Sequence, residues 1–311
     1  MKIINISAAA LICAFVFFAA AAISEKYKKA PQPVGMKTFA DSLNVSPQNG
    51  KIVLTGKENG FSFAVEDGAW RVEQCGGYFA DYNMISMVIY MLNSSRLYNY
   101  AGKDIQFVPD WKIEVFEGNK LLNSAEVMKN EDSRYLAKVF GSDKIYEMTQ
   151  MYDFPQSCDI WLKQPLVALQ QKDISSVGIG EYVFSRDDEE EDFAAQADEK
   201  NYLAGLFKEL SNFKFITALP AADGKKFSAI NELRIETFGG LIIKISLLQK
   251  DEKYYVSVTP DTTVVPLAGL REYVENNKVL YDGWLFEISE NQAKNFMPLQ
   301  KNIQLSEPVA N

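Results

Sequence analysis

The sequence predicts an α+β fold of two tandem, similar units, each a largely antiparallel sheet with one main helix, after an N-terminal transmembrane helix. A strand-like phrase occurs twice, as IEVFEG at residues 113–118 and IETFGG at residues 235–240. A helix pattern precedes each copy, and a hairpin pattern precedes each helix. The three blocks keep their order at an offset of about 120 residues, which is typical of a duplicated domain and not of a solenoid repeat.

Each predicted unit opens with a hairpin, in which short apolar runs are separated by turn residues. The expected strands are residues 52–54, 61–65 and 70–72 in the first unit, and 177–179 and 182–185 in the second, with Phe193 near the position of Trp70.

One helix follows each hairpin, at residues 81–97 and at residues 199–215. Asp81 and Asp198 precede these patterns, and aspartate is a favoured N-cap because its carboxylate accepts hydrogen bonds from the first free backbone N–H groups. Apolar residues line one face of each helix at matching positions. They are Ile85, Val88, Ile89 and Leu92 in the first helix, and Leu203, Leu206, Phe207 and Leu210 in the second.

A meander of strands follows each helix. DSRYLAKV at residues 132–139 matches DEKYYVSV at residues 251–258, so Tyr135 and Tyr254 are expected at equivalent strand positions. The same holds for Ile113 and Ile235, and a last strand near Trp284 is expected to complete the second unit.

The first 24 residues predict a membrane segment. Residues 3–23 are an uncharged, mostly apolar run of about 20 residues, long enough to span a bilayer as a helix. A cleaved signal peptide usually has a shorter apolar stretch, so the length favours an uncleaved anchor, while Ala22 and Ser24 leave cleavage open. We expect a single-pass protein of the bacterial inner membrane with a periplasmic globular part. The lysines on both sides of the run leave its orientation open.

The organisation that follows from these patterns has five segments. Prolines, a glycine and small polar residues predict a linker after the apolar run. The segments are a membrane anchor or signal at 1–24, the linker at 25–50, a first α+β unit at 51–160, a second at 161–300 and a tail at 301–311.

Composition excludes several classes of function. The chain of 311 residues is 47% hydrophobic, as in a globular protein with a core, and its net charge of −9 disfavours a nucleic-acid surface. It contains no histidine, which excludes Ser-His-Asp catalysis, Cys-His catalysis and most zinc sites. Outside the apolar run, Cys75 and Cys158 can pair in an exported domain or remain as buried free thiols, and the sequence leaves both open.

A further group of features resembles a family of bacterial membrane-anchored proteins, domain of unknown function 4340. They are the N-terminal anchor, DGAW at residues 67–70, the Ala80-Asp81 pair before a helix, the second unit after Asp173, and DGW at residues 282–284. Phe193 departs from the pattern, which favours tryptophan there. The resemblance covers most of residues 46–299. It implies an auxiliary role in a gliding-motility-type ABC transport system, and it supplies no catalytic residues.

Each conspicuous polar or aromatic motif has a structural interpretation. The acidic run DDEEED at residues 187–192 is expected to be a solvated hairpin tip, although it could also meet a basic partner or divalent ions. Asp67 and Asp282 precede glycines and predict turns. Gly178 and Gly180 lie in a strand pattern and not in a phosphate loop. The four tryptophans could line a pocket but favour core packing; they are Trp70, Trp111, Trp161 and Trp284.

The sequence therefore predicts a non-enzymatic, membrane-anchored, extracytoplasmic binding module. It assigns no catalytic, cofactor-binding or metal-ligating residue, and it indicates as partners the membrane and ABC transporter subunits or other envelope proteins. Two alternatives stay open. One is a carboxylate-based glycan hydrolase, which needs two acidic residues across a cleft. The other is a structural scaffold without a ligand.

Overall fold

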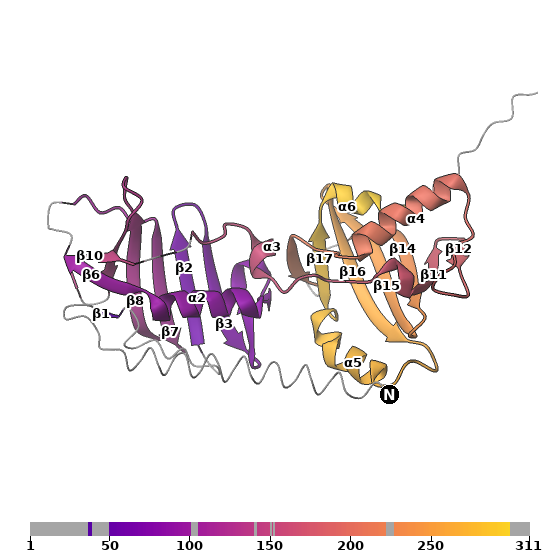
Figure 1. Cartoon of the computed structure of the whole chain (residues 1–311), viewed down its shortest axis with the longest axis horizontal. Coiled ribbons are helices and arrows are strands. Elements are labelled where there is room, and N and C mark those ends of the chain that lie inside the picture. Colours follow the sequence, from indigo (N-terminus) through magenta and orange to yellow (C-terminus); the bar gives the residue numbers. More distant parts are fainter. Residues whose placement is uncertain are drawn as a thin grey trace, which may run out of the picture.

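Two antiparallel sheets lie side by side along the long axis of the molecule in the computed structural model (Figure 1). The structure describes residues 37–38, 50–100, 105–139, 142–149, 151, 153–221 and 227–298. All strand pairings among these residues are antiparallel, so the predicted class of mixed helices and antiparallel sheets is confirmed. The buried side chains of both sheets form one contiguous core.

Within the described residues the first sheet has ten strands, in the order β1-β6-β10-β9-β8-β7-β2-β3-β4-β5. The main helix of this unit is α2 (Tyr82–Ser94), and α3 (Cys158–Trp161) leads to the second unit. The strands are β1 (Lys37–Thr38), β2 (Gly50–Gly56), β3 (Gly60–Glu66), β4 (Ala69–Val72), β5 (Tyr78–Phe79), β6 (Arg96–Tyr100), β7 (Trp111–Glu117), β8 (Lys120–Lys129), β9 (Tyr135–Val139) and β10 (Ile145–Met148), with the 3-10 turn η1 (Glu73–Cys75).

The second sheet, as far as the structure describes the chain, has seven strands in the order β12-β11-β14-β15-β16-β17-β13. They are β11 (Ile174–Ile179), β12 (Tyr182–Ser185), β13 (Thr217–Pro220), β14 (Ser228–Thr237), β15 (Leu241–Lys250), β16 (Lys253–Thr262) and β17 (Trp284–Ile288). The helical elements are η2 (Gln171–Asp173), α4 (Ala197–Leu210), α5 (Leu270–Asn277), η3 (Lys278–Leu280) and α6 (Glu290–Lys294).

The two sheets share one strand order. The run β3-β2-β7-β8-β9-β10-β6 of the first sheet corresponds to β12-β11-β14-β15-β16-β17-β13 in the second. Ile113 in β7 and Ile235 in β14 therefore occupy corresponding strands, and both are fully buried. Tyr135 in β9 and Tyr254 in β16 correspond in the same way. The strand expected near Trp284 is β17, which belongs to the second sheet and pairs with β16.

Asp81 caps α2 as predicted, because its carboxylate accepts hydrogen bonds from the backbone N–H groups of Asn83 and Met84. The corresponding prediction for Asp198 is wrong. The N-cap of α4 is Gln196, whose N–H donates to the Glu199 carboxylate at 2.7 Å. Asp198 lies inside the first turn, where its negative charge complements the helix dipole.

Both helices end earlier than their patterns predicted. α2 stops at Ser94, since Ser95 has an extended backbone and its hydroxyl donates to the Met91 carbonyl oxygen at 2.7 Å. The buried Leu97 belongs to β6, and the buried Phe213 and Phe215 follow the end of α4. A buried apolar residue fits a helix face and a strand equally well. Periodicity alone therefore extended both predicted helices beyond their real C-terminal ends. The second unit also carries α5 and α6, so the prediction of a single main helix is too simple there.

The predicted anchor at residues 1–24 and the tail at 301–311 lie outside the described residues. No helix in the described part of the chain is long and apolar enough to cross a membrane. The expected linker at 25–50 contributes two described pieces to the first sheet. Lys37 and Thr38 form β1, which pairs with β6, and Gly50 begins β2.

Tyr78 joins the two units. Its ring meets Phe215, Trp284 and Phe286 of the second unit edge-on, with centroid distances of 5.1–5.4 Å. Its hydroxyl donates to the Leu280 carbonyl oxygen at 2.9 Å, and burial raises its pKa. A buried hydroxyl without this acceptor would be costly, so the hydrogen bond fixes how the units meet.

Gly76 permits the close approach of the two units. It has φ +77°, and a Cβ on it would fall on the backbone carbonyl oxygen of Ala218 in β13. Gly77 beside it has φ +75°, but a Cβ there would meet nothing within 4 Å. Only the first of these glycines is therefore required by contact between the units as well as by backbone conformation.

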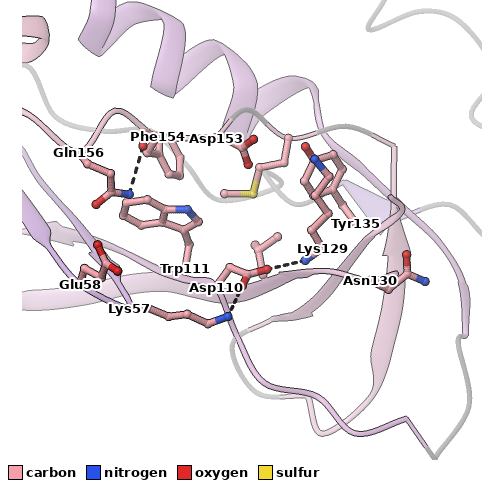
Figure 2. A pocket seen from close by; sticks show the side chains of 12 residues that line it. Lys57, Glu58, Asp110, Trp111, Lys129, Asn130, Tyr135, Asp153, Phe154 and Gln156 are labelled. Atoms are coloured by element: carbon pink, nitrogen blue, oxygen red, sulfur yellow. Dashed lines mark hydrogen bonds and ion pairs between the residues drawn. The ribbon is translucent and has the colours of Figure 1, made fainter. Parts of the chain in front are cut away.

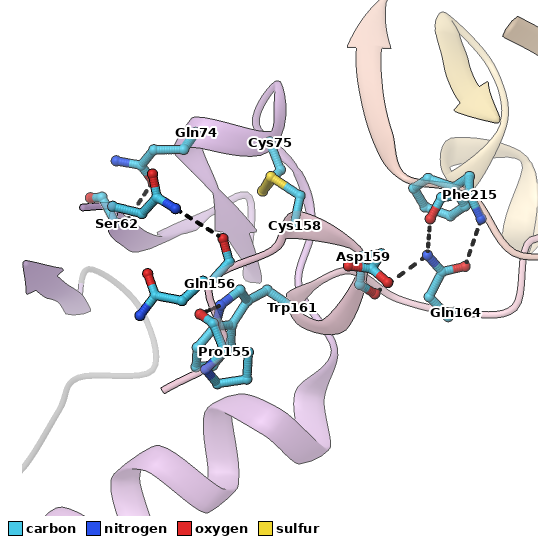
Figure 3. Close-up of a disulfide and its surroundings, with 11 residues drawn as sticks. Ser62, Gln74, Cys75, Pro155, Gln156, Cys158, Asp159, Trp161, Gln164 and Phe215 are labelled. Atoms are coloured by element: carbon cyan, nitrogen blue, oxygen red, sulfur yellow. Dashed lines mark hydrogen bonds between the residues drawn. A yellow bond between two sulfur atoms is a disulfide. The ribbon is translucent and has the colours of Figure 1, made fainter. Parts of the chain in front are cut away.

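A disulfide between Cys75 and Cys158 settles the alternative that the sequence left open (Figure 3). It joins η1 to the start of α3, across a sequence separation of 83 residues, next to the junction. Beyond α3, the side-chain amide of Gln164 donates to the Phe215 carbonyl oxygen at 2.7 Å and its oxygen accepts from the Phe215 N–H. The connecting segment is thus fastened at both ends.

The disulfide is expected to stabilise the fold. Replacing both cysteines, Cys75→Ala with Cys158→Ala, should lower the free energy of unfolding by about 2–4 kcal/mol, because the unfolded chain loses a covalent loop closure. Urea unfolding without reductant measures the change. In excess reductant the wild-type protein should have the same free energy of unfolding as the double variant. A wild-type free energy of unfolding that does not change with reductant would contradict the prediction.

The two adjacent glycines give a matched test of the junction. Gly77→Ala should cost about 1–2 kcal/mol of unfolding free energy, for placing a Cβ in the left-handed region. Gly76→Ala should cost a further 1–3 kcal/mol or so, because it also overpacks against β13. Urea unfolding of both variants gives the difference. Equal losses would show that the approach of Gly76 to Ala218 does not hold the units together.

Candidate functional site

A cavity of about 580 Å³ opens in the first unit, at the end of the sheet where β7 begins and β8 ends (Figure 2). Its base is apolar. Trp111 and Phe154 are both buried, and their rings meet edge-on with centroids 5.1 Å apart. The other lining residues are Val127 and Met151 at the base, Tyr135 at the start of β9, and Lys57, Glu58, Asp110, Lys129, Asn130, Asp153 and Gln156 around the opening.

Local sequence explains how the base is assembled. Gly56 ends β2 against the Trp111 ring, and a Cβ there would lie 2.8 Å from that ring, so only glycine fits without a shift. The N–H of Gly56 donates to the Asn59 carbonyl oxygen at 2.8 Å, which closes the β2–β3 turn. The Asn59 amide then donates to the Gln156 carbonyl oxygen at 3.3 Å. The turn thereby holds the segment that carries Phe154 over the tryptophan.

Asp110 organises the charged side of the opening. Its carboxylate accepts a hydrogen bond from Lys57 Nζ at 2.6 Å and another from the backbone N–H of Lys129 at 2.7 Å. Burial raises the pKa of this carboxyl, but the N–H of Lys129 and the ammonium of Lys57 outweigh burial and hold the pKa below its usual value. Asp110 is therefore an ionised carboxylate that ties β8 to the β2–β3 turn.

The remaining polar groups give the opening both signs of charge. The Lys129 ammonium lies 5.6 Å from the centre of the Tyr135 ring. Glu58, beside Lys57, and Asp153, near Phe154, are exposed at the rim (Figure 2). An apolar base under a mixed polar rim suits a ligand or partner side chain with a flat apolar body and polar edges.

The tryptophans mostly support the packing interpretation. Trp161 is fully buried among Phe61, Phe63 and Phe154, and its indole N–H donates to the Pro155 carbonyl oxygen at 3.0 Å. Trp70 and Trp284 pack partly buried against the core. Trp111 alone of the four lines the cavity in the first unit, so it combines packing with a role at the site.

The acidic run at residues 187–192 is not the tip of a hairpin. The run is not followed by a second hairpin strand, because the chain continues through a loop that contains Phe193 and then enters α4. Arg186, which is only 9% exposed, holds the loop by donating to four backbone carbonyl oxygens. These acceptors belong to Gln171, Ile174, Glu189 and Glu191. The six acidic side chains are exposed, as predicted.

The predicted turn residues keep structural roles. Asp67 and Gly68, with φ +51° and +76°, form the turn between β3 and β4. Asp282 lies between η3 and β17, so it belongs to a turn but not to a hairpin. Gly178 lies in β11, and Gly180, with φ +57°, makes the β11–β12 turn.

Sequence reasoning missed most of the cavity. Lys57, Asp110, Met151 and Phe154 carried no recognisable signal, since they come from segments about 40–50 residues apart that only the sheet order brings together. Within the described ranges no group of three or more Cys, Asp or Glu residues is placed to hold a metal ion. Comparisons with protein-family models, with curated proteins and with solved structures find no match to this chain.

The lowered pKa of Asp110 predicts a pH-dependent contribution to stability. The ionised carboxylate stabilises the fold above the unfolded pKa of about 3.9, and this contribution is lost as the pH falls through the lower folded pKa. The difference in unfolding free energy between wild type and Asp110→Asn should therefore be largest near neutral pH and shrink below about pH 4.

Urea unfolding at neutral and acidic pH measures this difference. The exposed Asp153 on the same rim provides the control, because it makes no ion pair with any described residue. Asp153→Asn should differ little from wild type at either pH. A difference for Asp110→Asn that stays constant with pH would contradict the role of its charge.

Proposed function

We propose that this protein is a non-enzymatic, membrane-anchored binding module on the extracytoplasmic side of the bacterial inner membrane, auxiliary to an ABC-type transport system. The observation that carries the proposal is the cavity under the rim of Lys57, Glu58 and Asp153. Its buried Trp111 and Phe154 offer a desolvated pocket for an anchoring side chain of a partner, and its polar rim matches the periphery of a protein interface.

Two features support the location. A disulfide such as Cys75–Cys158 persists in oxidising compartments, of which the periplasm is one. The apolar run at residues 3–23 has the length of a membrane span. A tether confines the module to a thin layer and raises its effective concentration near a membrane partner, so weak contacts at the cavity suffice.

The repeated strand order supports a duplicated unit whose two copies have diverged at their edges. The first copy carries the cavity, and residues 1–24 tether both copies to the membrane in this proposal. The separation of tether, cavity-bearing unit and second unit suits an accessory protein that bridges envelope components.

The glycan-hydrolase alternative is less well supported. Such an enzyme needs a carboxylic acid whose pKa is raised, so that it can act as a general acid near neutral pH, and a second carboxylate close to it. The Asp110 carboxyl at the rim has a lowered pKa and is bound by Lys57, which suits a structural anion. The scaffold alternative leaves the cavity without a use.

Site-specific photocrosslinking in native membranes tests the proposal. A photoreactive phenylalanine analogue at Glu58 or at Asp153 should crosslink a transporter subunit, because both exposed positions border the cavity. The same analogue at Lys208, exposed on α4 of the other unit, is the matched control and should give no such product.

A parallel screen for turnover of cell-wall glycans covers the enzymatic alternative. Crosslinks at both rim positions together with no turnover would support the binding module. Turnover that disappears in the double variant Glu58→Gln with Asp153→Asn, without a crosslinked membrane partner, would overturn it.

A further inference from the structure

Strand β12 forms an open edge of the second sheet. Among the residues that the structure describes, it is the terminal strand and pairs only with β11 (Figure 1). The N–H of Arg186 donates to the Ser175 carbonyl oxygen at 3.0 Å, which fixes which residues bond to β11. Hydrogen-bonded residues alternate along an antiparallel pair. Val183 and Ser185 therefore direct their backbone N–H and C=O groups away from the sheet.

In the first unit, a further strand pairs at the position that corresponds to this edge. Strand β3 corresponds to β12 in the shared order, and its outer side is covered by β4, which pairs from Phe63↔Val72 to Glu66↔Ala69. At the same point the second unit has no strand, because the chain enters the acidic loop. An antiparallel strand at this position is thus compatible with the fold, and none of the described residues supplies one in the second unit.

The side chains of β12 do not protect its edge. The strand reads Tyr-Val-Phe-Ser, without the charges or proline that usually blunt a free edge. Val183 is 71% exposed and sits opposite Gly178, which has no side chain to cover it. An extended segment could therefore contact Val183 directly as well as its backbone.

Acidic side chains next to the edge carry negative charge that is not neutralised by ion pairs within the described residues. The Arg186 guanidinium is occupied by backbone carbonyl oxygens, so it positions the loop without neutralising its carboxylates. Asp187, Glu189 and Glu190 are exposed and form no ion pair within the described residues. Glu181 lies at the other end of the strand. Both ends of β12 thus attract positive charge.

We propose that β12 is a docking edge for an extended, basic segment of a partner protein, which adds an antiparallel strand beside it. Main-chain hydrogen bonds from Val183 and Ser185 would provide the pairing, and the acidic loop would select lysine or arginine near the ends of the segment. A second copy of this chain is the wrong partner, since pairing two β12 strands would bring Glu181 and the acidic loops together. The edge lies in the other unit from the cavity, so this inference stands apart from the proposed function.

A synthetic peptide tests the proposal with the full-length protein in mild detergent. The probe has six alternating threonine and valine residues with two lysines at each end, and its matched control has glutamate in place of lysine. The lysine peptide should bind, weaken with added salt, and slow deuterium exchange at the amides of Val183 and Ser185. The glutamate peptide should not bind.

Two variants separate pairing from charge. Val183→Pro removes an outward N–H and blocks the edge, and it should weaken binding at least about tenfold while the ladder to β11 remains. Val183→Thr keeps the N–H and should bind within about threefold of wild type. Neutralising the loop with Asp187→Asn, Glu189→Gln and Glu190→Gln should weaken binding at least about fivefold at low salt.

Thermal unfolding checks that each variant is folded, and the loop variant keeps the test decisive should Val183→Pro unfold. Peptide binding without protection of residues 182–185 would show adhesion to the acidic loop alone and would overturn the docking edge. Full binding by folded Val183→Pro, equal binding of both peptides, or no binding of the lysine peptide would do the same.

Discussion

The burial of Tyr78 at the junction sets how the two units meet. Its ring can leave water only if Phe215, Trp284 and Phe286 of the second sheet surround it, and its hydroxyl then requires the Leu280 carbonyl oxygen. Nearby, Gly76 lets the backbone of the first unit touch β13, and the disulfide fixes the connector. Two sheets that could each fold around their own hydrophobic face therefore share one core.

Because the two units are held together, the features in which they differ have fixed positions relative to each other. The sheets share a strand order, but the first continues past β3 into β4 and β5, whereas the second stops at β12. The first also leaves space above Trp111 where the segment after β10 crosses the end of the sheet. The cavity and the open edge therefore both lie where the two copies diverge, because the common strands are occupied with the core and the edges are free to change.

Two charged side chains show how the protein orders its loops without exhausting its surface charge. The Asp110 carboxylate accepts the backbone N–H of Lys129, and the Arg186 guanidinium donates to backbone carbonyl oxygens. In both cases a partly desolvated charge satisfies main-chain groups that would otherwise be unpaired. The rim of the cavity and the acidic loop are thus held in place while the charged side chains around them stay exposed.

The local features of this protein could be predicted from its sequence. Hydrophobic periodicity predicted both hairpins and both main helices, and the repeated phrase predicted corresponding strands. Asp81 predicted a helix cap and Asp67 predicted a turn. These features depend on neighbours a few residues away. Three long-range features could not be predicted: Cys75 meets Cys158, Trp111 lies under Phe154 beside Asp110, and Phe193 lies in a loop and not in a strand. Periodicity specifies which face of a strand is buried, but not which strand lies next to it or where the chain leaves the sheet.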